Sequence, residues 1–204
     1  HLTTQEDSHD AWLTGEVVGF YMELMQRRNI RQQFFQPVSV FPKPNCYFFN
    51  EIFYPDFAMS SRRNGSDDTG YRYSNPNISC GESFENVDVF SYDLLFAVVN
   101  RSSVHWTLIV VDIKKKRIEH FNSLYSGNKP GSRIIEIDMM RRWLGDEFHY
   151  KNAWSKHPGL TKEASKRLDI GPDGAWTFHA WDPKVNGSPR QSEDYNCGVF
   201  ALQT

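Results

Sequence analysis

Residues 104–112 of the chain read Val104-His105-Trp106-Thr107-Leu108-Ile109-Val110-Val111-Asp112. Their apolar run and a second one, from Leu94 to Val99, are each short enough for a buried strand and too continuous for an amphipathic helix. We therefore expect these two segments to form the centre of a sheet. The charged run from Lys114 to Lys116 lies between strand-like segments, so it predicts a solvated hairpin turn and not a binding patch.

Two helices and a further strand are predicted around this sheet. An amphipathic helix is expected over residues 14–28, with Thr14 as a possible N-cap. Its recurring residues are Leu13, Val17, Phe20, Tyr21, Leu24 and Arg28. A second helix is predicted from the spacing of Ile134, Ile137, Met140, Trp143 and Leu144. We expect it to end at Gly145, as a C-cap glycine. Alternation at Trp176, Phe178 and Ala180 predicts another strand.

The length and charge of the chain predict one domain with a protein partner. The 204 residues, 39% of them apolar, suit a single domain over residues 1–204. The chain begins at His1 and ends soon after Cys197, so we expect a fragment that lacks some C-terminal sequence. A net charge of −2 is unlike the basic footprint of a nucleic-acid binder, and it favours a protein or peptide partner.

The cysteines indicate a reducing compartment. Cys46, Cys80 and Cys197 are odd in number and form no Cys-x-x-Cys pair, which favours free thiols. No apolar run reaches the ~18 residues that a membrane-spanning helix needs. We therefore expect an intracellular monomer, in the nucleus or cytoplasm, without membrane contact. No ligand pair has the spacing of a zinc site, so neither a metal nor another cofactor is expected.

Cys197 is the candidate nucleophile. A free cysteine is only a few per cent thiolate near neutral pH, so it needs a nearby cation or a helix N-terminus to act. Asn196 or Asp194 precedes the apolar run Gly198-Val-Phe-Ala-Leu202, which predicts a helix that begins at Cys197. His105 is the candidate cation. A thiol, an imidazole and an amide donor are the parts of a cysteine protease.

Asn122 and Gln191 are the candidate polar partners of this pair. The segment after the predicted turn returns through Arg117-Ile-Glu-His-Phe-Asn122, so the Asn122 amide can accept a hydrogen bond from the His105 ring. His120 lies on the same face of that strand, as a rival orienting residue or as a half-buried polar one. Gln191 could donate its side-chain N–H to a developing oxyanion together with the Cys197 backbone N–H. A lone glutamine is otherwise a surface loop residue.

Three separated motifs resemble the ubiquitin-like-protein proteases, the SUMO-specific (sentrin-specific) cysteine protease family. They are Ala11-Trp-Leu-Thr-Gly-Glu-Val-Val-Gly-Phe-Tyr21, Phe121-Asn-Ser-Leu124 and Tyr195-Asn-Cys-Gly-Val-Phe200. The intervals also match, because Cys197 lies six positions after Gln191 and Asn122 lies seventeen positions after His105. The chain departs from the family where Gly15, Asn122 and Asn196 replace the usual acids.

The resemblance implies an α+β, papain-like fold with a central mixed sheet flanked by helices. It implies a catalytic domain that cleaves the peptide or isopeptide bond after the C-terminal Gly-Gly of a ubiquitin-like modifier, with SUMO or its conjugates as the leading partner. Trp106 and Trp12 are expected to line a narrow channel over the scissile bond, although an unplaced tryptophan more often packs in a core. The long polar loop from Ser60 to Cys80 and the segment from Asp146 to Asp173 are expected to contribute to modifier recognition.

Two other functions remain open at this point. The neutral amides Asn122 and Asn196 are compatible with a pseudo-protease that binds a ubiquitin-like protein without cutting it. The same thiol chemistry would also serve a deubiquitinase or an acetyltransferase of related fold.

Overall fold

The computed structural model describes residues 13–35, 43–51, 53, 87–101, 105–124, 134–150, 176–181, 190–191 and 196–203. Its elements run in the order α1 (Gly15–Phe35), β1 (Cys46–Phe48), the 3-10 turn η2 (Val89–Ser91), β2 (Leu94–Arg101), β3 (His105–Asp112), β4 (Arg117–Phe121), α4 (Ile135–Tyr150), β5 (Thr177–Trp181) and α7 (Cys197–Gln203). Trp12, the loop from Ser60 to Cys80 and residues 151–173 lie outside the described residues.

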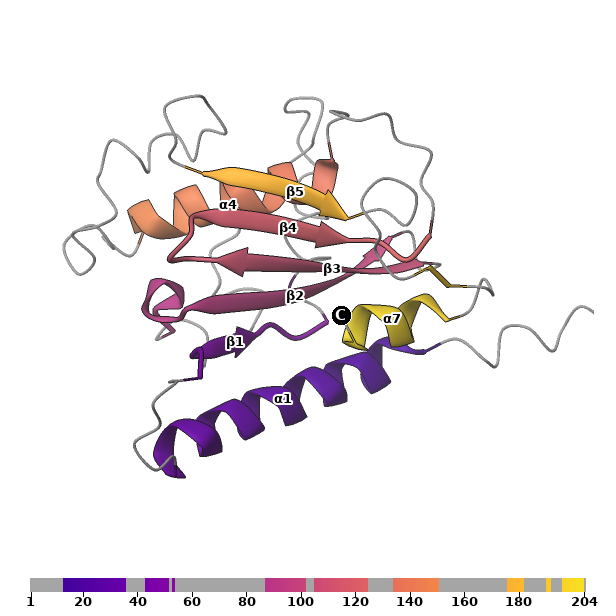
Figure 1. The fold of residues 1–204 in the computed structure, drawn as a ribbon, viewed down its shortest axis with the longest axis horizontal. Helices are drawn as coiled ribbons and strands as arrows, with labels where there is room; N and C mark the ends of the chain where they lie inside the picture. Colours follow the sequence, from indigo (N-terminus) through magenta and orange to yellow (C-terminus); the bar gives the residue numbers. More distant parts are fainter. Residues whose placement is uncertain are drawn as a thin grey trace, which may run out of the picture.

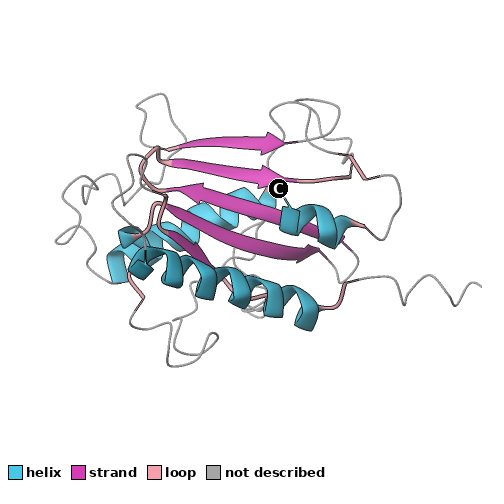
Figure 2. Cartoon of the chain, turned by 60° about the horizontal axis from the view of Figure 1, so that its bottom comes forward, coloured by secondary structure: helices cyan, strands magenta, loops and turns pink. Residues whose placement is uncertain are grey.

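The strands form one mixed sheet in the order β1-β2-β3-β4-β5 (Figure 1). The outer pairs β1–β2 and β4–β5 are parallel, whereas β2–β3 and β3–β4 are antiparallel. The helix α4 covers one face of the sheet, and α1 and α7 lie on the other (Figure 2). The predicted α+β fold is confirmed, and the two apolar runs are confirmed as the inner strands β2 and β3.

The two faces of β3 belong to two separate hydrophobic clusters. Ile109 and Val111 pack with the buried side chains of α4, among them Trp143. Leu108 and Val110 pack on the other face, with Cys197 and Ala201 of α7. Both faces of the strand are therefore dry, which is why its sequence reads as a continuous apolar run.

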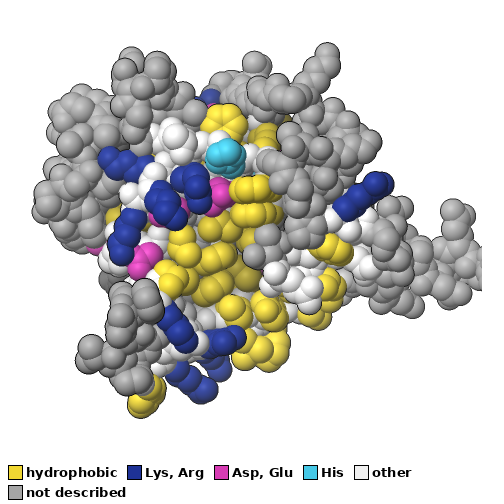
Figure 3. All heavy atoms as spheres, in the orientation of Figure 1, with side chains coloured by type: hydrophobic (Ala, Val, Ile, Leu, Met, Phe, Trp, Pro, Cys, Tyr) yellow, Lys and Arg dark blue, Asp and Glu magenta, His cyan; other side chains and the backbone are white. Residues whose placement is uncertain are grey.

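The helix α1 is longer than predicted and presents a different face to the protein. It continues to Phe35 instead of ending near residue 28, and its buried residues are Val18, Met22 and Asn29. The predicted apolar stripe faces outward: the exposed side chains of α1 include Val17, Phe20, Tyr21 and Leu24. Figure 3 shows hydrophobic and basic side chains side by side on the surface over α1, at the bottom of the view.

The inward face of α1 is partly polar because it closes the free edge of β1. The Asn29 Oδ1 accepts a hydrogen bond from the Cys46 N–H at 3.1 Å, and the Asn29 Nδ2 donates to the Cys46 carbonyl at 2.7 Å. The Gln26 Oε1 accepts from the Phe48 N–H at 2.9 Å. An unpaired strand edge exposes backbone groups that need partners, so polar residues replace part of the apolar face that the periodicity predicted.

The helix α4 does not end at Gly145. Gly145 lies inside α4 and is buried, and the helix continues to Tyr150. The extra turn carries Phe148, whose ring packs edge-on against Phe90 at a centroid distance of 5.3 Å. This tertiary contact outweighs the roughly 1 kcal/mol that a glycine costs inside a helix.

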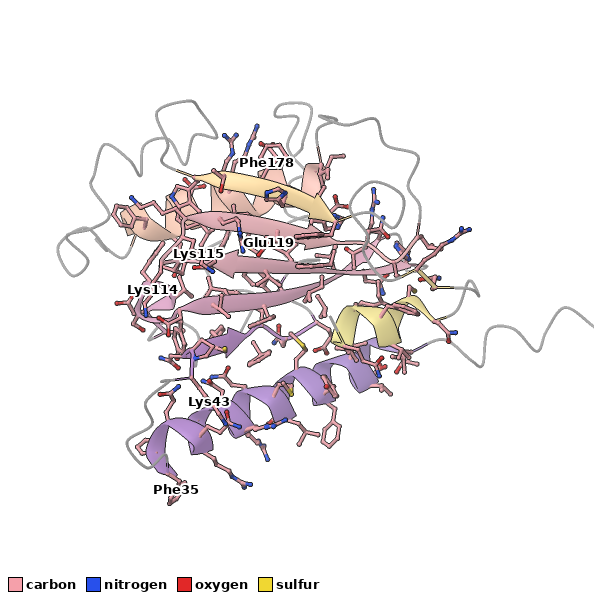
Figure 4. The ribbon with its side chains drawn as sticks, viewed as in Figure 1. Phe35, Lys43, Lys114, Lys115, Glu119 and Phe178 are labelled. Carbon is pink, nitrogen blue, oxygen red and sulfur yellow. The ribbon has the colours of Figure 1, made fainter. Side chains whose placement is uncertain are left out.

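Other predicted elements have the expected form. Strand β5 begins at Thr177, one residue after the start of the predicted segment, and residues 113–116 form the hairpin turn between β3 and β4. The turn brings Lys116 into the left-handed region at a φ of 52°. Lys114 pairs with Asp93 at 2.6 Å and Lys115 with Asp112 at 3.0 Å, at the end of the sheet where Figure 4 labels both lysines. Within the described residues, no helix is long and apolar enough to cross a membrane.

Candidate active site

Cys197 begins α7 and lies against the start of β3. The Asn196 carbonyl accepts a hydrogen bond from the Phe200 N–H at 3.2 Å, so Asn196 precedes the helix as predicted. Cys197 is a buried, free cysteine. Its Sγ accepts a hydrogen bond from the backbone N–H of Trp106 at 3.4 Å. The sulfur is thus held beside the residue that follows His105.

The His105 ring is held by Asn122. The His105 Nε2 and the Asn122 Oδ1 are 2.8 Å apart. The same oxygen accepts the Leu124 N–H at 3.0 Å, and the Asn122 N–H donates to the Trp181 carbonyl at 3.1 Å. Because a backbone N–H only donates, the Asn122 oxygen is the atom that faces Leu124 and His105. The His105 Nε2 is therefore the donor, and in the neutral ring the lone pair is on Nδ1.

The His105 Nδ1 is the ring atom left for proton exchange. It is buried and has no hydrogen-bond partner among the described residues. Burial lowers the pKa of His105, and the hydrogen bond that its Nε2 donates to Asn122 raises it. The positive charge of Arg101 also lowers this pKa, whereas the negative charge of Glu136 raises it. Because burial is the largest influence, a proton on this ring needs an anion close by.

His120 is a neighbour of this pair and not the orienting residue. Its side chain is only 3% exposed. Burial lowers the pKa of His120 to about 4, so the ring is neutral near pH 7. Of the two candidates, Asn122 makes the hydrogen bond to His105.

Gln191 is buried and tied to the residue after Asn122. The Gln191 Oε1 accepts a hydrogen bond from the Ser123 Oγ at 2.6 Å, and the Gln191 N–H donates to the Ser123 carbonyl at 3.2 Å. With its side-chain oxygen held by Ser123, the amide has its N–H donors on the opposite branch. A surface position for Gln191 is excluded by its 3% exposure. Sequence reasoning gave Ser123 no role, although it stands in the same motif as Asn122.

Trp106 is part of the core and is anchored by its indole. It is 5% exposed, and its Nε1 donates to the Leu13 carbonyl at 3.0 Å. Gly198 makes room for this contact, because a Cβ at that position would lie 2.9 Å from the Leu13 Cδ1 and 3.2 Å from the Trp106 Cδ1. The structure thus joins His105 to Asn122 and Cys197 to the backbone of Trp106, and it joins Gln191 to Ser123, the residue after Asn122. The Trp12 prediction falls outside the described residues.

The model of the Ulp1 protease family, C-terminal catalytic domain, matches residues 11–204 of the chain. The chain belongs to the Ulp1 protease family. This confirms the predicted family of ubiquitin-like-protein proteases, and it places these side chains in the catalytic domain of a thiol protease family.

Relatives and solved structures agree with this assignment. The chain is 25% identical to the ubiquitin-like-specific protease ESD4 of Arabidopsis thaliana, over 95% of the chain and 31% of that protein. It is 27% identical to sentrin-specific protease 2 of Homo sapiens, over 94% of the chain and 25% of that protein. The chain therefore spans a third or less of the length of these two relatives.

A solved structure of the Ulp1 protease domain in complex with Smt3, the yeast ortholog of SUMO, matches with a TM-score of 0.53 at 21% identity. It covers 94% of this chain and 62% of that chain. A second match, described as the crystal structure of the de-sumoylating protease, has a TM-score of 0.56 at 18% identity and covers 98% of this chain and 64% of that chain. Both confirm the fold.

The substitution Gly198→Ala tests the close packing at the start of α7. The added methyl group must displace Leu13 or Trp106, so the free energy of unfolding should fall by about 1–3 kcal/mol. Urea unfolding measures the loss, and the indole N–H resonance of Trp106 should shift. The control Val199→Ala, at an exposed position of the same helix, should change stability by less than about 0.5 kcal/mol. Equal stability of Gly198→Ala and the unmodified protein would contradict this packing.

Proposed function

We propose that this domain is a cysteine protease that hydrolyses the peptide or isopeptide bond after the C-terminal Gly-Gly of a ubiquitin-like modifier, with SUMO as the leading substrate. The observation that carries the proposal is that the Cys197 Sγ accepts a hydrogen bond from the N–H of Trp106, the residue that follows His105 in the chain. The 2.8 Å hydrogen bond between His105 and Asn122 supports a ring whose Nδ1 accepts the thiol proton.

The reaction begins with proton transfer. The His105 Nδ1 takes the proton of the Cys197 thiol, while Nε2–H stays bonded to Asn122. The resulting thiolate is stabilised by the Trp106 N–H and by the start of α7. Burial disfavours a lone imidazolium, so the thiolate is the counter-ion that keeps the proton on His105.

The thiolate then attacks the carbonyl carbon of the terminal glycine. The C–S bond forms and the carbonyl π electrons move to oxygen, where the Gln191 side-chain N–H and the Cys197 backbone N–H would donate hydrogen bonds. Collapse of this intermediate breaks the C–N bond, and His105 protonates the leaving amine. A water molecule, deprotonated by His105, hydrolyses the thioester and releases the modifier with a free carboxylate.

The substrate assignment rests on the relatives and on Trp106. Relatives bear the names ubiquitin-like-specific protease and sentrin-specific protease, and one similar structure holds the yeast ortholog of SUMO. The indole of Trp106 is fixed by Leu13, which supports a rigid aromatic wall beside the sulfur. Trp12 precedes Leu13 in the sequence and is proposed as the second wall. A channel between flat rings leaves no room for a Cβ, so it would select glycine.

Asn122 favours one competing function, a pseudo-protease that binds the modifier without cutting it. A neutral amide orients the ring but gives the imidazolium less electrostatic support than a carboxylate. Binding without covalent capture would be the signature of this second function.

A panel of electrophile-tipped modifiers distinguishes the two functions. We expect the SUMO probe to form a stable adduct at Cys197, faster than ubiquitin and other Gly-Gly modifiers, as measured by mass spectrometry. Cys197→Ser should abolish the adduct, whereas Cys46→Ser, which removes the other described free thiol, should leave it unchanged. Binding of the SUMO probe without an adduct would support the pseudo-protease instead.

The substitution Asn122→Asp tests the orienting role of Asn122. The carboxylate accepts the same hydrogen bond and adds a negative charge beside the imidazolium, so kcat should stay unchanged or rise by up to about tenfold. Asn122→Leu, which removes the acceptor, should lower kcat on the order of a hundredfold. Hydrolysis of a fluorogenic modifier substrate measures both variants. Loss of activity in folded Asn122→Asp protein would remove Asn122 from this role.

A further inference from the structure

An ion pair lies directly beside His105, on the face of the sheet that α4 covers. Arg101, the last residue of β2, is the cross-strand partner of His105, the first residue of β3. Directly opposed residues in an antiparallel pair project to the same face. The Arg101 Nε lies 2.7 Å from the Glu136 Oε1, and the two side chains are 41% and 5% exposed.

Glu136 lies at a position of α4 that stabilises a carboxylate and lets it pair with a residue of the sheet. It lies in the first turn of α4, at the positive end of the helix dipole. Its buried charge needs a partner, because an uncompensated buried charge is strongly destabilising. Arg101 is that partner. The pair therefore ties the start of α4 to the strand ends at which His105 stands.

We propose that the Arg101–Glu136 ion pair is a positioning and charge-balancing element for His105. Glu136 holds the guanidinium of Arg101 beside the imidazole and cancels its positive charge there. This inference rests on the proposed function for the role of His105, but the charge balance itself is a property of the folded chain.

The balance matters because of the other groups that face His105. Arg101 of β2, Glu136 of α4 and His120 of β4 interact electrostatically with His105. Cys197 of α7 contacts the backbone N–H of Trp106, the next residue in the chain, and Asn122 contributes no charge. His120 is buried and neutral, as its lowered pKa of about 4 indicates. An unbalanced Arg101 would repel the imidazolium, and an unbalanced Glu136 would replace the thiolate as its counter-ion. When the charges of Arg101 and Glu136 cancel each other, the charge of Cys197 determines whether His105 stays protonated.

Two single substitutions and their combination test the charge balance. The two single substitutions should shift the pH midpoint of His105 protonation in opposite directions, and the combination should restore it. Glu136→Gln leaves Arg101 unopposed, so the midpoint of His105 protonation should fall by about half to one pH unit. Arg101→Met leaves Glu136 unopposed, so the midpoint should rise by a similar amount. The double variant should return close to the unmodified protein. NMR titration of the His105 ring measures all three, and the alkaline limb of the kcat/KM profile should move in the same directions.

Two controls separate this effect from damage to the fold. Arg101→Lys keeps the positive charge and should keep the midpoint. Asp138→Asn breaks the ion pair with Arg141, 2.9 Å long, on the same helix, and should leave the His105 titration unmoved. The proposal would be overturned if the midpoint shifted in the same direction in both single variants. It would also be overturned if the midpoint shifted in neither of them. If no modifier is hydrolysed at all, the proposed function fails, while the NMR titrations still decide the charge balance.

Discussion

The hydrogen bond between the His105 Nε2 and the Asn122 Oδ1 is the interaction on which the rest of the site depends. It joins the start of β3 to the residue after β4, and it determines which ring nitrogen carries the lone pair. Because the backbone N–H of Leu124 can only donate, the side-chain oxygen of Asn122 is fixed on the side that faces Leu124 and His105. The chemistry of a thiol protease then follows from the free nitrogen and the nearby sulfur.

The sheet and its two hydrophobic clusters bring these groups together. The antiparallel register of β2, β3 and β4 brings Arg101, His105 and Asn122 to one end of the sheet. On the other face, α7 packs against β3, and Gly198 permits the close approach that leaves Cys197 beside the Trp106 N–H. Asn122 is neutral, and the charges of Arg101 and Glu136 are paired 2.7 Å apart. We therefore propose that the Cys197 thiolate is the main counter-charge of the imidazolium.

Much of this arrangement could be predicted from the sequence, and the exceptions have physical causes. The inner strands were predictable because β3 is buried on both faces, and Asn122 was predictable from its place after the hairpin. The predicted end of α4 at Gly145 was wrong. A glycine in this position is typical of a helix C-terminus, and only the tertiary contact between Phe148 and Phe90 explains why the helix continues. The prediction of which face of α1 is buried was wrong because Asn29 and Gln26 face inward and hydrogen-bond to the edge strand β1. A search for apolar periodicity does not detect such polar contacts. The pairs Ser123–Gln191 and Arg101–Glu136 join segments far apart in the chain, so no local pattern indicates them.

We propose that the Cys197 thiolate holds the proton on His105, against the effect of burial. The most direct test is an NMR titration of the His105 ring in the unmodified protein and in Cys197→Ala. Burial lowers the pKa of His105, and Cys197→Ala removes the anion proposed to oppose this effect, so the ring of the variant should lose its proton at a lower pH than the ring of the unmodified protein. With the sulfur present, the imidazolium should persist to clearly higher pH. The same titration midpoint in both proteins would contradict the account.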